Sequence, residues 1–98
     1  MSGKTTVANT VQAKFEICNS LGLHLRPARM LAELANRFRS EVFIAKDSEV
    51  VNGKSIMGII TLAAATGEIL KVTAVGPDAQ EAVNAVGKLI ENKFGEED

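Results

Sequence analysis

The chain has 98 residues, of which 46% are hydrophobic, and this length and composition suit one compact domain with a single core. Eleven basic and twelve acidic side chains leave a net charge of −1, and Trp and Tyr are absent, so we expect no nucleic-acid binding. No apolar run reaches the roughly 18 residues that a membrane-spanning helix needs. Cys18 is the only cysteine and has no disulfide partner within the chain, which favours a reducing compartment. Together, these two observations predict a cytoplasmic protein without membrane insertion.

The first third of the chain predicts a leader, a strand and a helix. Residues 1–10 are polar and are interpreted as a flexible leader. Residues 11–17 alternate between apolar and polar side chains, the period-two pattern of a half-buried strand. After a loop, residues 26–38 carry apolar side chains at helical spacing. Pro27 suits the first turn of this helix, because its missing N–H would have no intrahelical partner there.

The middle of the chain predicts a hairpin and a second helix. Residues 41–46 and 49–51 are short and rich in β-branched residues, and the Asp47-Ser48 pair between them is typical of a tight turn. Ser55 follows a break at Asn52-Gly53 and is expected to cap a helix that runs to about Ala65.

The last third predicts one more strand and one more helix. Residues 70–74 alternate like a half-buried strand. Asp78 and Glu81 have the spacing of a capping box, in which the side chain at the helix start accepts a backbone N–H of the first turn. The helix that follows has an amphipathic pattern. We expect an acidic tail at residues 95–98, frayed from Glu96 to Asp98, after a domain that spans residues 11–94.

The predicted order of elements is β-α-β-β-α-β-α, with no internal repeat or linker. Strands that alternate cleanly and helices with one apolar face each imply two layers. We therefore predict an α+β fold, a two-layer open-faced β-sandwich. Its four-stranded antiparallel sheet is covered by the three helices on one face and by water on the other.

The only histidine of the chain, His24, stands where a strand-like segment gives way to a helix. A helix start carries unpaired N–H groups and about half a positive charge, so it is suited to an anion. Arg26, two residues further on, has a planar fork of donors that fits phosphate oxygens. These surroundings disfavour the imidazolium and leave a neutral, nucleophilic ring. The site is suited to a phosphoryl group that is attached to His24 and passed on, although a solvated or capping histidine remains the alternative.

Two segments resemble one known family. Residues 22–28, GLHLRPA, resemble the active-site motif of HPr, the histidine-containing phosphocarrier of the bacterial phosphoenolpyruvate-dependent phosphotransferase system. Residues 52–59, NGKSIMGI, resemble the segment around the serine that a dedicated HPr kinase phosphorylates in some bacteria. The two motifs lie at the family's separation, and the resemblance covers about residues 10–94.

The resemblance implies a role for each matching residue. His24 is similar to the histidine that takes a phosphoryl group at Nδ1 from enzyme I, ultimately from phosphoenolpyruvate, and donates it to IIA-type acceptors. Arg26 is similar to the arginine that contacts the phosphohistidine. Ser55 resembles the regulatory serine, which implies HPr kinase/phosphorylase as a further partner. Leu25 departs from the small residue or Thr of many members, and this difference bears on partner contacts. The chain is then a monomeric relay that needs no cofactor or metal, and not a stand-alone enzyme.

The helix after Ser55 carries large apolar residues on more than one face, so some of them must point outward. They predict either a broad core stripe or a docking patch, and methionine is adaptable at surfaces that meet several partners. The resemblance favours docking. The partner-binding residues that we expect are Leu25, Pro27, Ile56, Met57 and Ile60.

Three other functions are compatible with the same residues. The first is a regulatory carrier of the nitrogen-related branch, which residues 19–22 and the acidic end with Phe94 resemble. A small-ligand-binding regulatory α/β module would need no special role for His24. A paralogue that only docks through Met57 would carry no phosphate, and the pair His24 and Arg26 argues against it.

Overall fold

The computed structural model describes residues 9–96, and within them the predicted order of strands and helices is confirmed. Residues 1–8 of the predicted leader and residues 97–98 of the predicted tail lie outside this range. The strands are β1 (Thr10–Glu16), β2 (Glu41–Lys46), β3 (Glu49–Asn52) and β4 (Ile69–Val75). The helices are α1 (Leu25–Ala35), α2 (Ile56–Thr61) and α3 (Ala79–Glu91), followed by the short 3-10 helix η1 (Lys93–Gly95).

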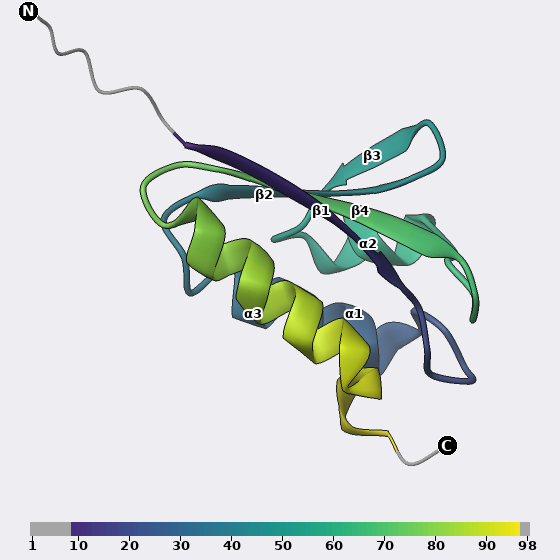
Figure 1. The fold of residues 1–98 in the computed structure, drawn as a ribbon. Helices are drawn as coiled ribbons and strands as arrows, with labels where there is room; N and C mark the ends of the chain where they lie inside the picture. The colour runs from purple at the N-terminus through teal and green to yellow at the C-terminus, as the bar shows by residue number, and fades with distance from the viewer. Residues whose placement is uncertain (1–8, 97–98) are drawn as a thin grey trace, which may run out of the picture.

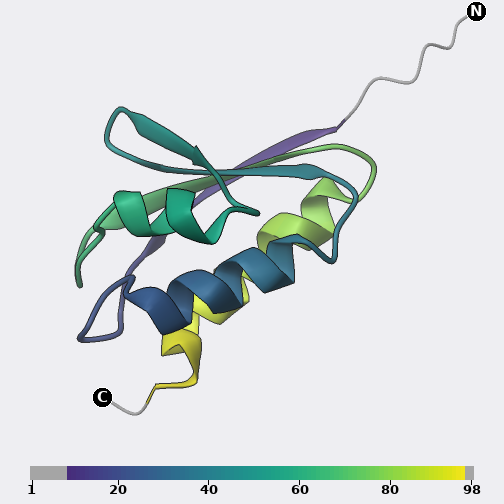
Figure 2. The same ribbon diagram turned by 180° about the vertical axis from the view of Figure 1, so that it is seen from behind.

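The four strands form one antiparallel sheet in the order β1-β4-β2-β3, so the predicted open-faced sandwich is confirmed. All three helices cover the same face of this sheet (Figures 1 and 2). On β4 the side chains of Leu70, Val72 and Ala74 are buried beneath the helices, whereas Lys71 and Thr73 between them are only half-buried. This period-two burial is what a sheet with one solvated face requires.

Helix α2 ends earlier than its apolar sequence predicts. It spans Ile56–Thr61, not a helix to about Ala65. Leu62 caps its C-terminus, and Ala63 takes a left-handed conformation with φ +49° that stops the helix. The residues that follow α2 pair instead with the segment before α1, where the backbone N–H of Leu23 donates to the carbonyl of Ala64 at 2.9 Å.

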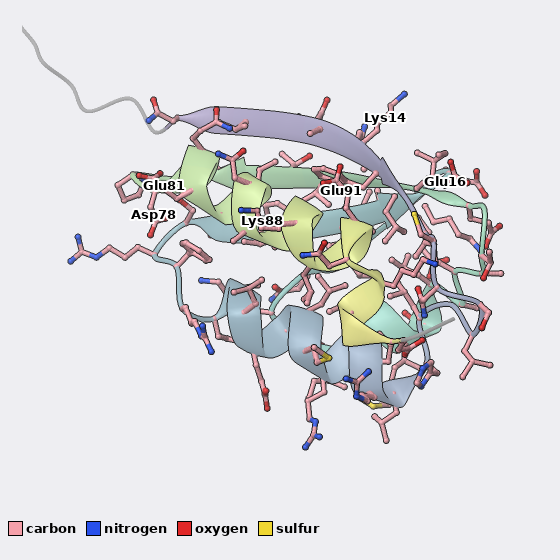
Figure 3. The ribbon with its side chains drawn as sticks, turned by 60° about the horizontal axis from the view of Figure 1, so that its bottom comes forward. Lys14, Glu16, Asp78, Glu81, Lys88 and Glu91 are labelled. Carbon is pink, nitrogen blue, oxygen red and sulfur yellow. The ribbon has the colours of Figure 1, made fainter. Side chains whose placement is uncertain are left out.

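Asp78 stands at the start of α3, but the predicted capping box is wrong. Its side chain makes no capping hydrogen bond. Instead, its carboxylate accepts the N–H of Arg39 at 2.9 Å and both the N–H and the hydroxyl of Ser40, at 2.8 and 2.6 Å. Figure 3 shows Asp78 beside the loop that links α1 to β2. The hydrogen bond from the Ser40 hydroxyl, followed by that from Arg39, lowers the pKa of Asp78 from 3.8 to about 2.

Asp78 should therefore make the stability of the fold depend on acid pH. Because its folded pKa lies below the unfolded value, its contribution is complete above about pH 3.8 and is lost as the pH falls through about 2. Asp78→Asn is expected to lower the free energy of unfolding at neutral pH, and the gap from the wild type should close towards pH 2. Urea titrations across this range measure both effects. Glu81→Gln, which neutralises an exposed carboxylate on the same helix, is the control and should leave the acid dependence unchanged.

Candidate functional site

His24 occupies the N-cap position of α1, as its place in the sequence predicts. Its backbone is extended (φ −82°, ψ −172°), and its side chain makes no capping hydrogen bond and is 37% exposed. The intrahelical ladder begins with the N–H of Ala28, which donates to the His24 carbonyl at 3.0 Å. The N–H groups of Leu25 and Arg26 therefore have no intrahelical acceptor, and Pro27 has no N–H at all. An accessible imidazole thus lies beside the positive end of a helix.

The loop before His24 is held against the segment that follows α2. Gly22 has a φ of +68°, and a Cβ on this residue would lie 2.5 Å from the carbonyl oxygen of Ala64. Asn19 reinforces the loop, since its side-chain amide donates to the Gly22 carbonyl at 2.8 Å. The backbone around the histidine is thereby fixed before any partner arrives.

We expect Gly22→Ala to destabilise the protein by about 3 kcal/mol, because the methyl group adds a clash with backbone to the cost of a positive φ. Gly67→Ala is a matched control. Gly67 also has a positive φ, of +88°, but nothing lies within 4 Å of its Cβ position, so only the conformational cost of about 1 kcal/mol should appear. Chemical denaturation of both variants measures the difference, and equal losses would show that the contact with Ala64 does not hold the loop.

Two arginines lie beside the histidine. A shallow hollow is lined by His24, Leu25, Arg26 and Arg29. Arg26 was expected here, whereas Arg29 was not singled out from the sequence. The signal was available, because residues three apart on a helix lie on the same side. Both guanidinium groups are exposed at this end of α1, and the hollow combines positive charge with the free N–H groups of the helix start.

The carboxylate of Glu96 contacts the imidazole ring of His24. Oε2 of Glu96 lies 2.9 Å from Nε2 of His24 and 3.5 Å from a guanidinium nitrogen of Arg26. Oε1 of the same side chain accepts a hydrogen bond from Asn19 at 3.1 Å. Only 15% of the Glu96 side chain is exposed. The expectation that the chain is frayed from Glu96 onward is therefore wrong for Glu96. No local pattern could have revealed this contact, because 72 residues separate the two partners.

Ser55 caps α2 as predicted, and its hydroxyl accepts the N–H of Gly58 at 3.0 Å. It does not lie next to His24. The start of α2 contacts the far end of α1, where Asn36 donates to the carbonyl of Lys54 at 3.1 Å. An 11-residue helix is about 16 Å long, so roughly this length of α1 separates the two predicted phosphorylation sites.

The expected partner-binding residues differ in accessibility. Leu25 and Met57 are exposed, at 64% and 70%, and can meet another protein. Ile56 and Ile60 are half-buried against the core. Pro27 is buried in α1, so it offers little surface to a partner, and its role in partner contact stays a prediction. Leu21, in the loop before the histidine, is also exposed and was not singled out from the sequence.

Within residues 9–96, no group of three or more His, Cys, Asp or Glu side chains is arranged to hold a metal ion. None of the helices in this range is long and apolar enough to cross a membrane.

Comparisons with known proteins agree with these features. The family model of the PTS HPr component phosphorylation site matches residues 11–92. The phosphocarrier protein HPr of Neisseria meningitidis is 43% identical over 86 residues, which cover 88% of this chain and 97% of the relative. The HPr-like protein Crh of Bacillus subtilis is 42% identical over 83 residues, or 85% and 98% of the two chains. Among solved structures, HPr-C-His from Thermoanaerobacter tengcongensis superimposes with a TM-score of 0.85 at 45% identity, covering 89% of this chain and 98% of that one.

Proposed function

Because this chain belongs to the HPr family of phosphocarrier proteins, we propose that it receives a phosphoryl group on His24 from phosphorylated enzyme I and passes it to IIA-type acceptors. Phosphoenolpyruvate is the ultimate source. The observation that carries the proposal is a partly exposed imidazole at the N-terminus of α1, beside Arg26 and two backbone N–H groups without an intrahelical acceptor. The chain then acts as a relay in the cytoplasm and catalyses no reaction alone.

The chemistry needs only groups that this site provides. The lone pair on Nδ1 of the neutral imidazole attacks the phosphorus, and the bond between phosphorus and the donor's nitrogen breaks with its electron pair going to that nitrogen. The transferred group carries about two negative charges, which the start of α1 and the guanidinium of Arg26 stabilise. The open hollow beside these groups admits both a donor and an acceptor. All of them come from one copy of the chain, so a monomer suffices.

Partner docking is proposed for the exposed apolar side chains of α1 and α2. Leu25 stands next to His24 in the chain, and Met57 lies on α2, which packs along α1 (Figure 2). Apolar side chains that remain exposed on a small domain are suited to transient contacts with several partners. Ile56 and Ile60 contribute the rim of this surface, since both are only half-buried.

Ser55 is proposed as a regulatory site for HPr kinase/phosphorylase. A phosphate on its hydroxyl would lie at the start of α2, where the helix tolerates negative charge. Because α1 separates Ser55 from His24, the added charge would act on partners that dock over α2 rather than on the imidazole itself.

A regulatory carrier of the nitrogen-related branch is the second candidate. The two segments that resemble that branch, residues 19–22 and the end with Phe94, are brought together at the histidine by the contact of Asn19 with Glu96. Acceptor specificity separates the two roles. A sugar-uptake carrier should pass its phosphoryl group to sugar-specific IIA proteins, and a regulatory carrier to nitrogen-branch IIA proteins.

The proposal is tested by incubating the full chain with phosphoenolpyruvate and enzyme I. We expect an acid-labile adduct of one phosphoryl group, which peptide mapping at alkaline pH assigns to His24. A parallel incubation with ATP and HPr kinase should give an acid-stable adduct at Ser55. If an active enzyme I produces no labile adduct, the relay is excluded and a small-ligand-binding module becomes the better explanation.

A further inference from the structure

The contact between Glu96 and His24 restricts the chemistry of the imidazole ring. A carboxylate can only accept hydrogen bonds, and it lies 2.9 Å from Nε2. Nε2 must therefore carry the proton in this contact. In the neutral ring the other nitrogen, Nδ1, then keeps its lone pair.

We propose that Glu96 is a positioning residue for phosphoryl transfer. It holds His24 as the tautomer with the proton on Nε2, orients the ring and leaves Nδ1 as the nucleophile. This inference rests on the proposed function, since it says how the same histidine is made ready. The arrangement is the one by which a buried carboxylate fixes the tautomer of a catalytic histidine in hydrolases.

The Glu96 carboxylate is itself held in place. Its Oε1 accepts the side-chain amide of Asn19, a fully buried residue that also donates to the Gly22 carbonyl. Both partners of this amide are acceptors, so its NH₂ group must face them. The same asparagine thus fixes the loop before His24 and the carboxylate that contacts the ring. Their relative positions are set by one side chain.

The backbone around Glu96 shows that this position is built into the fold. Lys93 and Phe94 both have positive φ angles, of 58° and 55°, which are costly for residues other than glycine. Phe94 is completely buried, and this burial offsets the cost of the turn. The N–H of Glu96 then donates to the Lys93 carbonyl at 2.9 Å. The turn at Lys93 and Phe94, held in place by the buried Phe94 ring, therefore directs Glu96 towards His24.

Glu96 would also stabilise the positive charge that the imidazole ring gains during phosphoryl transfer. When Nδ1 forms its bond to phosphorus, the ring still carries the Nε2 proton and becomes positively charged. The carboxylate of Glu96 faces this proton and stabilises that charge. When the phosphoryl group leaves, the electron pair of the P–N bond returns to Nδ1, and the ring is again neutral with its proton on Nε2. The step consumes no other reactant.

Arg26 is compatible with this role because its contact with Glu96 is loose. Its guanidinium nitrogen lies 3.5 Å from Oε2, compared with 2.9 Å for Nε2 of His24, and half of its side chain is exposed. The arginine can therefore turn towards an incoming phosphoryl group while the carboxylate stays on the ring.

The first test reads the tautomer directly and needs no phosphorylation. Nitrogen-15 NMR of the His24 ring is recorded over a series of alkaline pH values, up to the point where the spectrum no longer changes with pH. We expect the Nε2–H form to dominate in the wild type and in Glu96→Gln, whose amide oxygen still accepts a hydrogen bond from Nε2–H. Glu96→Ala should show a mixture of both tautomers. Glu91→Ala, which removes an exposed carboxylate from α3 (Figure 3), should match the wild type.

The second test measures the rate of phosphoryl uptake from phosphorylated enzyme I. We expect kcat/KM to fall about tenfold in Glu96→Ala, the effect of losing one charge-assisted hydrogen bond, and less in Glu96→Gln. The inference would be overturned if Glu96→Ala kept the tautomer ratio of the wild type, or if it took up the phosphoryl group at the wild-type rate. The proposed relay would stand in either case. A wild-type chain that is never labelled would instead refute the proposed function, and the NMR result would still report on Glu96.

Discussion

Replacing His24 with alanine is expected to abolish phosphoryl uptake, with a loss of more than about 10³-fold, because the nucleophile itself is removed. No other imidazole exists in the chain to take its place. The measurement is the rate of acid-labile labelling by phosphoenolpyruvate and enzyme I. Labelling of His24→Ala at the wild-type rate would show that the phosphoryl group is carried elsewhere.

Arg26 should give a graded result in the same assay. Arg26→Ala removes one of the positive groups that face the transferred phosphate, and we expect kcat/KM to fall by roughly 10- to 100-fold. Arg26→Lys should lie between this variant and the wild type, because lysine keeps the charge but loses the planar fork of donors. Arg37→Ala is the control, since Arg37 is an exposed arginine beyond the other end of α1. An equal loss in the control would mean that overall charge, and not the site, sets the rate.

Removing the ring of Phe94 is the substitution from which we expect the largest loss of stability. Phe94→Ala empties a fully buried position and should lower the free energy of unfolding by about 3–5 kcal/mol. The variant also loses the anchor that returns the chain to His24, so the tautomer signal of the imidazole should become mixed in the fraction that remains folded. Urea denaturation and nitrogen-15 NMR measure the two effects.

Phe43→Ala is a matched control for this loss. Phe43 lies on β2, is only half-buried and lines a hollow on the open face of the sheet with Val50 and Thr73. Its removal should cost much less than removal of Phe94 and should leave the imidazole signal unchanged. Equal losses in the two variants would contradict the role of Phe94 as an anchor.

The regular elements and the position of the histidine could be predicted because they depend on neighbours in the chain. The alternation in β4 specified which face of the strand is buried, and the Ser55 hydroxyl had its partner, Gly58, three residues away. His24 and Arg26 were placed at a helix start by the same kind of local signal. The end of α2 was less predictable, because Ala63 leaves helical geometry in favour of pairing between Ala64 and Leu23, about forty positions earlier.

The sequence by itself determined the fold class, the family and a nucleophilic nitrogen at the positive end of a helix. Only the tertiary structure decided which distant carboxylate contacts the other nitrogen of the His24 ring. The Asp78 carboxylate accepts hydrogen bonds from Ser40 and does not cap α3, and the Glu96 carboxylate contacts His24 and is not frayed. In both cases the donor is far away in the sequence and is brought close only by folding. Short-range periodicity specifies strands and helices, but it contains no information on which distant side chains meet. Here burial of the Phe94 ring in the core brings the second carboxylate to the imidazole.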